Sequence, residues 1–198
     1  MNLMKIIIAP SKTQNENIDK EGKWTAPLFL SKAEEIVDTV SRFDKEKFSR
    51  YLKVKGKLLE SAYKQYSNFN RSTLYPAIYC YSGEVFKKLN LHVYTNDENE
   101  YMQSHLVILS ALYGPLKPFD HIRMYRLDMK MKVFEDKNLY SFWSEEIESY
   151  FQDEEVIVNL ASDEFSSLVK KEMTNVIFKE KKKENEFKIV GIYSKQAR

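Results

Sequence analysis

Four short apolar runs along the chain predict β-strands inside a sheet. Each run ends at a Pro, a Gly or a small polar residue, which is the pattern of a strand closed by a turn. None alternates strictly between apolar and polar positions, so both faces of these strands are expected to be covered. The runs are Met4 to Ala9, Ala77 to Tyr81, Leu106 to Leu112 and Val156 to Ala161.

Two later runs, Asn175 to Lys179 and Phe187 to Tyr193, alternate more regularly and flank the charged stretch 180–186. We predict that they pair as an antiparallel hairpin, which makes the sheet mixed. Residues 179–188 carry five Lys and three Glu, and this charge is typical of a solvated hairpin tip.

Apolar residues spaced three and four positions apart predict helices over 31–42, 45–66, 141–151 and 163–170. A glycine inside a helix costs about 1 kcal/mol against alanine, so the second helix is expected to break at Lys55-Gly56. Asp163 is a candidate cap of the last helix. Residues 14–27 are polar, contain Gly22 and Pro27, and predict a surface loop.

Composition indicates a folded domain rather than a disordered chain. The 198 residues are 43% apolar and 30% charged, and this length fits one domain over 1–198 with a helical element at about 30–70. No run approaches the ~20 apolar residues that span a bilayer, and the N-terminal run is too short for a signal peptide. We therefore expect a cytoplasmic protein with no membrane partner. Its net charge of +2 selects no class of partner.

The cysteine and histidines point to neither a metal nor a cofactor. Cys80 is the one cysteine, so it forms no internal disulfide. Neither it nor His92, His105 and His121 show metal-ligand spacing, which also argues against direct storage of iron. Because Cys80 lies in an apolar run, we interpret it as a small buried hydrophobe rather than a reactive thiolate.

Basic residues gather in the predicted helix-turn-helix segment. Asp44 to Lys57 holds six Lys or Arg against two acids. Exposed backbone N–H groups at a turn and flanking lysines both favour phosphate oxygens, which suits a nucleic-acid backbone without reading its sequence. The alternative is an ordinary basic helix face.

Polar groups also collect where the predicted strands end. Tyr125 and Arg126 follow the turns after the strand that ends at Ser110, and the carboxyl ends of such strands face the crevice where sheet proteins bind ligands. A tyrosine there could stack on a base, and Arg126 could fork onto phosphate or a base edge. Alternatively, Arg126 pairs with Asp120 or Asp128 and the tyrosines lie half in the core. Asn159, Ser162, Lys12 and Lys195 also stand at strand ends.

No standard catalytic signature is present in the sequence. There is no Gly-x-Ser-x-Gly elbow, no Gly-x-x-x-x-Gly-Lys loop and no dinucleotide fingerprint. Asp163 and Glu164 are adjacent, and neighbours on a helix point about 100° apart, so they make a poor acid-base pair.

Seven motifs in order, from the first strand to the last residue, resemble the bacterial YaaA family of peroxide-stress proteins. They are Ala9-Pro10-Ser11-Lys12-Thr13, Tyr81-Ser82-Gly83-Glu84-Val85-Phe86, Leu109-Ser110-Ala111-Leu112-Tyr113-Gly114, Tyr125-Arg126-Leu127-Asp128-Met129, Asn138-Leu139-Tyr140-Ser141-Phe142-Trp143, Asn159-Leu160-Ala161-Ser162-Asp163-Glu164 and Tyr193-Ser194-Lys195-Gln196-Ala197-Arg198.

The resemblance implies an α+β fold, α/β-like in its buried strands, with a mixed sheet wrapped by helices, a basic cleft and a helix-hairpin-helix-like element in the N-terminal half that binds DNA. This element maps onto Leu52 to Leu58, which has one glycine where a standard hairpin has two. Family members are associated with limiting free intracellular iron, and hence oxidative DNA damage, under hydrogen peroxide. They usually continue for several tens of residues beyond the position of Arg198, so a segment forming one wall of the cleft is expected to be absent.

Two functions remain open at this point. The first is a DNA-binding protein of the peroxide response, with contacts to the phosphate backbone that are not sequence-specific. The second is an enzyme acting on a nucleobase or nucleoside in the same cleft, for which no general base is evident. The nucleic-acid-binding candidates are Lys12, Lys53, Lys55, Gly56, Lys57, Arg126, Lys195 and Arg198, and the cleft candidates are Ser11, Thr13, Gly83, Ser110, Tyr113, Gly114, Tyr125, Asn159 and Ser162.

Overall fold

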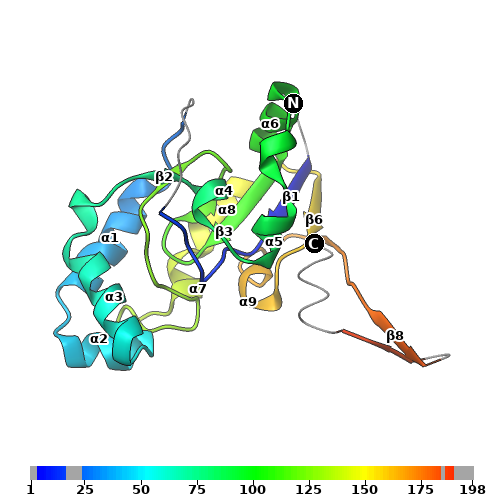
Figure 1. Ribbon diagram of the computed structural model, residues 1–198. Coiled ribbons are helices and arrows are strands. Elements are labelled where there is room, and N and C mark those ends of the chain that lie inside the picture. The colour runs from blue at the N-terminus through cyan, green and yellow to red at the C-terminus, as the bar shows by residue number, and fades with distance from the viewer. Residues whose placement is uncertain (1–3, 17–23, 184–185, 190–198) are drawn as a thin grey trace.

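A mixed sheet forms the centre of the computed structural model, which describes residues 4–16, 24–183 and 186–189. In the described residues this sheet has the strand order β4-β3-β1-β6-β7 (Figure 1). Strands β1, β3, β6 and β7 run parallel, and β4 runs antiparallel to β3. The strands are β1 (Met4–Ile8), β3 (Leu106–Ser110), β4 (Gly114–Leu116), β6 (Val156–Asn159) and β7 (Thr174–Asn175).

Three of the four predicted central strands are confirmed. Ile6 of β1 lies opposite Leu106 of β3 on one side and Val158 of β6 on the other. Ile7 and Ile108 are fully buried, as expected for strands with cover on both faces. The sheet is mixed as predicted, but the antiparallel member is the short strand β4.

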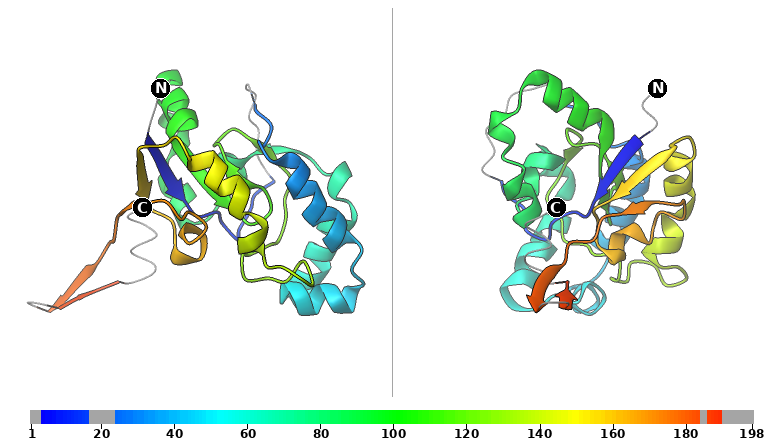
Figure 2. Two further views of the ribbon diagram at one scale, coloured as in Figure 1. Left: turned by 180° about the vertical axis from the view of Figure 1, so that it is seen from behind. Right: turned by 90° about the vertical axis from the view of Figure 1, so that its right-hand side faces the viewer.

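Helices cover both faces of this sheet. Figures 1 and 2 show α6 (Asn96–His105) and α8 (Ser144–Phe151) on opposite faces. The sequence pattern did not predict α6 because this helix is polar and buries only Met102 and His105. Its start is fixed by a capping box, in which the Thr95 hydroxyl accepts from the Glu98 N–H and the Glu98 carboxylate accepts from the Thr95 N–H.

The predicted helical element is confirmed as α1 (Leu30–Ser41), α2 (Lys45–Leu52) and α3 (Gly56–Ser67). The break falls at the expected place: Lys53 adopts a left-handed conformation after α2, and Gly56 opens α3 with φ +55°. The Asp44 carboxylate caps α2 by accepting from the Lys47 N–H at 2.7 Å. Apolar residues of all three helices join one continuous core with the sheet.

The predicted strand at Ala77 to Tyr81 is wrong, because this segment forms α4 (Ala77–Cys80). It follows β2 (Tyr75–Pro76), which pairs with β5 (His121–Ile122) in a separate two-stranded sheet. The N–H groups of Ala77 and Ile78 donate to the carbonyls of Asp120 and Pro118. A short buried apolar run is compatible with either element, so its periodicity alone could not decide.

The C-terminal hairpin exists, but its strands are not the predicted ones. Strands β8 (Glu180–Lys183) and β9 (Glu186–Lys188) take up the charged stretch that was expected to be the tip. Thr174–Asn175 instead joins the main sheet, and residues 190–193 lie outside the described residues. Figure 1 shows this hairpin extending from the side of the body opposite α1, α2 and α3.

Two predicted helices are shorter than the pattern suggested. The predicted helix 141–151 is divided into α7 (Leu139–Phe142) and α8. The predicted helix 163–170 is shortened to α9 (Asp163–Ser166), and Ser162 rather than Asp163 holds its N-cap position.

The remaining helices in the described residues are α5 (Glu84–Lys88) and the 3-10 turns η1 (Phe69–Arg71) and η2 (Leu91–Val93). In the described part of the chain, none of the helices combines the length and apolarity needed to cross a bilayer.

Candidate functional site

The carboxyl ends of β1 and β6 open onto a hollow of about 510 Å³. The two strands run parallel, so the residues that follow them come together at one edge of the sheet. We call this cavity the strand-end hollow. It is lined by residues 8–14, 82–87, 125–128, Leu160, Ser162, Glu164 and Phe165.

Seven of the predicted site residues line the strand-end hollow: Ser11, Lys12, Thr13, Gly83, Tyr125, Arg126 and Ser162. The sequence had missed its three acids, Glu84, Asp128 and Glu164, and the cation Lys87. Glu84, Asp128 and Glu164 lie inside the quoted sequence motifs, so their motif position was a signal that could have found them. Three cations therefore face three carboxylates in this lining.

Arg126 and Lys12 share one carboxylate. The Lys12 ammonium lies 2.7 Å from Asp128 Oδ2, and Nη2 of Arg126 lies 4.0 Å from the same oxygen. The second distance exceeds that of a hydrogen bond. In addition, Nε of Arg126 is buried without a hydrogen-bond partner in the described part of the structure. The pairing of Arg126 with Asp128 that we considered as an alternative is thus present but weak, and Asp120 pairs elsewhere, with Thr25 and Lys117.

Backbone contacts hold one wall of the strand-end hollow in place. The N–H of Ser82 donates to the carbonyl of Thr13, and the N–H of Tyr125 donates to Oε1 of Gln14. A Cβ added to Gly83 would lie 2.5 Å from Oγ of Ser11. Gly83 is therefore required for the close approach of the loop after β1 to the start of α5.

Four predicted cleft residues lie beneath the strand-end hollow rather than in its lining. Ser110 is fully buried, Tyr113 is 2% exposed and Asn159 is 7% exposed. The Asn159 amide donates to Oδ1 of Asn175 and its Oδ1 accepts from the Ala161 N–H, so both its polar atoms are used. Gly114 turns the chain between β3 and β4 with φ +69° and packs against the Trp143 ring. Because only 2% of Tyr113 is exposed, its ring does not present a face to a ligand.

Tyr125 belongs to a buried chain of hydroxyl groups. Its OH lies 2.8 Å from both Tyr81 OH and Ser110 Oγ. Ser110 Oγ in turn accepts from the N–H groups of Leu112 and Tyr113. Burial raises the pKa of Tyr81 and Tyr125 above the ordinary value, so both phenols stay protonated, and in each of the two contacts either hydroxyl can donate. This chain ties the floor of the strand-end hollow to the end of β3.

The protein offers no evident metal site within residues 4–16, 24–183 and 186–189, where no three His, Cys, Asp or Glu side chains gather to hold an ion. Cys80 is fully buried, as predicted. Burial raises the pKa of its thiol to about 12, which makes it unreactive at neutral pH.

The basic segment forms a separate, open groove. Lys45, Arg50, Lys53 and Lys55 line it with Glu46, Ser49 and Leu59, and we call it the α2–α3 groove. Lys53, Lys55, Gly56 and Lys57 are exposed, and in the described structure no ion pair engages these lysines. A Cβ added to Gly56 would meet nothing within 4 Å, so the turn is open to an approaching backbone.

The α2–α3 groove and the strand-end hollow share no lining residue. The expected single continuous cleft is therefore divided into two surfaces. They are connected through the core: the Tyr66 hydroxyl at the end of α3 donates to the carbonyl of Arg126, and the Lys132 N–H donates to the carbonyl of Tyr51. Lys195 and Arg198 lie outside the described residues.

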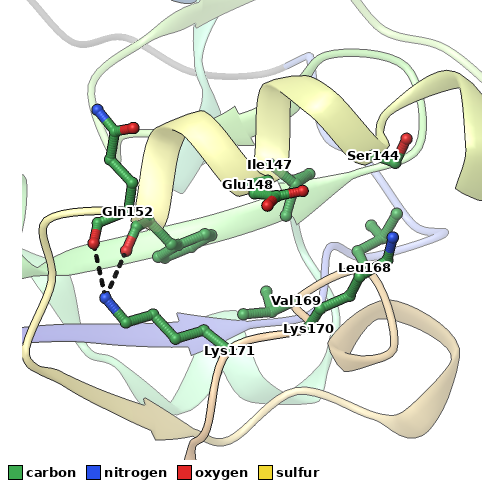
Figure 3. Close-up of a pocket in the computed structure, with 9 residues that line it drawn as sticks. Ser144, Ile147, Glu148, Gln152, Leu168, Val169, Lys170 and Lys171 are labelled. Atoms are coloured by element: carbon green, nitrogen blue, oxygen red, sulfur yellow. Dashed lines mark hydrogen bonds between the residues drawn. The ribbon is translucent and has the colours of Figure 1, made fainter.

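A third cavity, of about 320 Å³, lies between α8 and residues 168–171 (Figure 3). Ile147, Leu168 and Val169 contribute apolar lining, and the Lys171 ammonium donates to the carbonyls of Phe151 and Gln152 at the end of α8. None of the predicted site residues lines it.

Comparison with known proteins gives one family. The family model for "Peroxide stress protein YaaA" matches residues 4–198. Among curated proteins, a UPF0246 protein of Fusobacterium nucleatum is 38% identical over 98% of this chain and 82% of its own length. A UPF0246 protein of Rickettsia peacockii is 33% identical over 98% of this chain and 83% of its own. A UPF0246 protein of Francisella tularensis subsp. novicida is also 33% identical, over 98% of this chain and 84% of its own length.

Proposed function

The chain belongs to the YaaA family of peroxide stress proteins, and from this premise we propose that it binds DNA through the α2–α3 groove. The observation that carries the proposal is the composition of that groove, which has four cations and one acid in its lining beside an open turn. Lys45 is paired with Glu60 at 2.6 Å, and Arg50, Lys53 and Lys55 form no ion pair within the described residues. DNA presents closely spaced phosphates, so a surface of this kind gains affinity by releasing counterions.

The geometry of the turn supports a helix-hairpin-helix-like role for α2 and α3. Lys53 and Gly56 both take positive φ values, which reverses the chain within a few residues. Lys55 holds the N-cap position of α3 without a side-chain cap, so the first N–H groups of this 12-residue helix keep their capacity to donate. Such groups and the helix dipole favour a phosphate oxygen. They contact the backbone alone, so we propose binding without sequence specificity.

The salt dependence of DNA binding tests this proposal. Replacing Lys53, Lys55 and Lys57 together with Ala removes three phosphate partners, so the slope of log K against log salt should fall by about 3 in magnitude on duplex DNA. Fluorescence anisotropy over a salt series measures it. A control with Lys88, Lys117 and Lys170 changed to Ala loses the same charge from exposed positions outside the groove and should keep the slope. Equal salt slopes for wild type and the Lys53, Lys55 and Lys57 variant would reject the α2–α3 groove as the DNA-binding surface.

In this proposal the protein acts in the cytoplasm during peroxide stress, where it protects DNA from oxidation and limits free iron. No set of His, Cys, Asp or Glu in the described residues forms an iron site, so the proposed effect on iron is indirect. A strain lacking the gene, complemented with wild type or with the triple α2–α3 variant, separates the two effects: peroxide survival should require the three lysines. Rescue by the variant would show that DNA contact is not needed.

The alternative is an enzyme that acts on a nucleobase or nucleoside. The strand-end hollow favours it, since about 510 Å³ is within the usual size of small-molecule sites. Against it, the predicted cleft residues Tyr113 and Asn159 are buried and have protein partners, so neither is free to stack on a base or to bind its polar edge. Incubation with damaged or modified oligonucleotides tests for a released base, and its consistent absence would exclude this reaction.

A further inference from the structure

We propose that the strand-end hollow binds a small molecule in which one anionic group, a carboxylate or a phosphate, is joined to an apolar or aromatic body. This site is separate from the α2–α3 groove, and the inference does not depend on DNA binding. It is carried by Arg126, whose guanidinium has unused hydrogen-bonding capacity, and by the apolar residues of the same lining.

The lining holds three cations and three carboxylates, but their contacts leave Arg126 without a close partner, and Glu164 forms no ion pair within the described residues. Lys12 and Arg126 share Asp128, and Lys12 holds the close contact, at 2.7 Å against 4.0 Å. Lys87 lies near its own partner, Glu84, at 3.7 Å. A guanidinium at such a distance from its carboxylate can receive a second anion, and its planar fork matches the two oxygens of a carboxylate or phosphate.

Arg126 is also held in position before any ligand arrives. Its side chain is 19% exposed, and the flanking residues Tyr125 and Leu127 are each 5% exposed. The carbonyl of Arg126 accepts from Tyr66, and the N–H of Tyr125 donates to Gln14. These hydrogen bonds fix the backbone at Arg126, and its largely buried side chain has limited conformational freedom to lose on binding, which favours affinity for a small anion.

The rest of the lining suits the body of the ligand. Ile8, Phe86, Leu127 and Phe165 contribute apolar atoms to the lining, each from a residue that is at most 6% exposed, and Ser11, Thr13 and Ser162 contribute hydroxyl groups. A mostly apolar wall with a few placed polar groups is the usual composition of a small-molecule site. Inorganic phosphate alone would leave this wall uncovered, and a neutral nucleoside would leave Arg126 unpaired, so we expect both to bind more weakly than the joined ligand.

Isothermal titration calorimetry with four probes tests the site. Adenosine 5′-monophosphate supplies a phosphate on an aromatic body and 3-phenylpropionate supplies a carboxylate, whereas adenosine lacks the anion and inorganic phosphate lacks the body. Saturable binding of the monophosphate or the phenylpropionate, stronger than that of the two partial probes, supports the proposal and identifies the anion. No saturable binding of either at millimolar concentration, or equal binding of adenosine and its monophosphate, overturns it.

Variants at Arg126 assign the binding to this residue. R126Q should weaken binding of the anionic probe roughly tenfold to a hundredfold, because it removes a charge-assisted pair. R126K keeps the positive charge but lacks the planar guanidinium, so its affinity for the anionic probe should lie between those of R126Q and wild type. R71Q removes the same group from an exposed position outside the hollow and should bind as wild type. Equal binding by R126Q and wild type would overturn the assignment.

Two further measurements cover folding and DNA binding. If circular dichroism shows that R126Q does not fold, S162F serves in its place, because it fills the hollow with a larger side chain. S162F should block binding of the anionic probe, and unchanged binding by S162F overturns the assignment of the binding site to the strand-end hollow. The α2–α3 triple lysine variant should keep full affinity for the anionic probe. If R126Q instead flattens the DNA salt slope as that variant does, the hollow belongs to the DNA surface and the small-molecule proposal fails.

Discussion

At the scale of single residues, burial has replaced ligand contact at several predicted positions. Ser110 ends β3 as expected and Tyr125 lies in the loop after β5, yet their hydroxyls are used within the buried chain that starts at Tyr81. A buried hydroxyl without a partner costs free energy. The role of Tyr125 in this chain is therefore stabilising, and it can be measured independently of any function.

We expect Tyr125→Phe to lower the free energy of unfolding by about 1 to 3 kcal/mol, because it leaves two buried hydroxyls without their shared partner. Urea unfolding measures the change. Tyr101→Phe is the control: Tyr101 is 53% exposed, so its change should stay within about 0.5 kcal/mol. An equally small effect at Tyr125 would contradict the hydroxyl chain.

Gly114 and Gly56 separate backbone strain from close packing. Both have positive φ, but a Cβ on Gly114 would lie 2.8 Å from the Trp143 ring, whereas one on Gly56 would meet nothing. Gly56→Ala should cost about 1 to 2 kcal/mol from the left-handed backbone alone. Gly114→Ala should cost a further 1 to 3 kcal/mol, roughly, from overpacking. The two urea denaturation curves give the difference, and similar losses would show that Trp143 moves freely.

At the scale of elements, a charged network fastens α2 to the loop 130–137. Glu135 contacts Lys132 at 2.8 Å and Lys47 at 3.0 Å, and accepts from the Tyr51 hydroxyl at 2.7 Å. The hydrogen bond from Lys132 and those from Tyr51 and Lys47 lower the pKa of Glu135 from 4.5 to about 2. This network positions the α2–α3 unit against the segment that begins at Arg126.

A lowered carboxyl pKa gives stability that is present above pH 4.5 and is lost as the pH falls through about 2. Glu135→Gln should therefore lower the urea midpoint at pH 7, and the difference from wild type should shrink toward pH 2. The effect should be small and weaker in high salt, because the pair is exposed. Glu172→Gln, at an exposed position without a close basic partner in the described structure, is the control. A difference that stays constant with pH would rule out the ionised carboxylate as its source.

At the scale of the whole molecule, the sequence pattern predicted the strands β1, β3 and β6 and the α2–α3 break, because these depend on short apolar runs and on glycine, but it assigned the region of β7 to a hairpin. It missed α6, whose start depends on a capping box rather than on apolar spacing, and it misassigned residues 77–81, whose buried helix is set by contacts with residues 118–120. Ser11, Lys12 and Thr13 after β1 and Ser162 after β6 reached one hollow, as parallel strand direction implies. Gly83 follows the helix α4 instead, and Tyr125 and Arg126 come from the loop after β5. Which side chains face the solvent there depends on packing, and so Ser110, Tyr113 and Asn159 could not be placed from sequence.

The burial of Cys80 has a consequence for a protein of the peroxide response. Oxidants attack the thiolate of an accessible cysteine, and the single thiol of this chain is both enclosed and protonated. Cys80 is therefore a poor target for hydrogen peroxide, because its sulfur is neither accessible nor ionised at neutral pH.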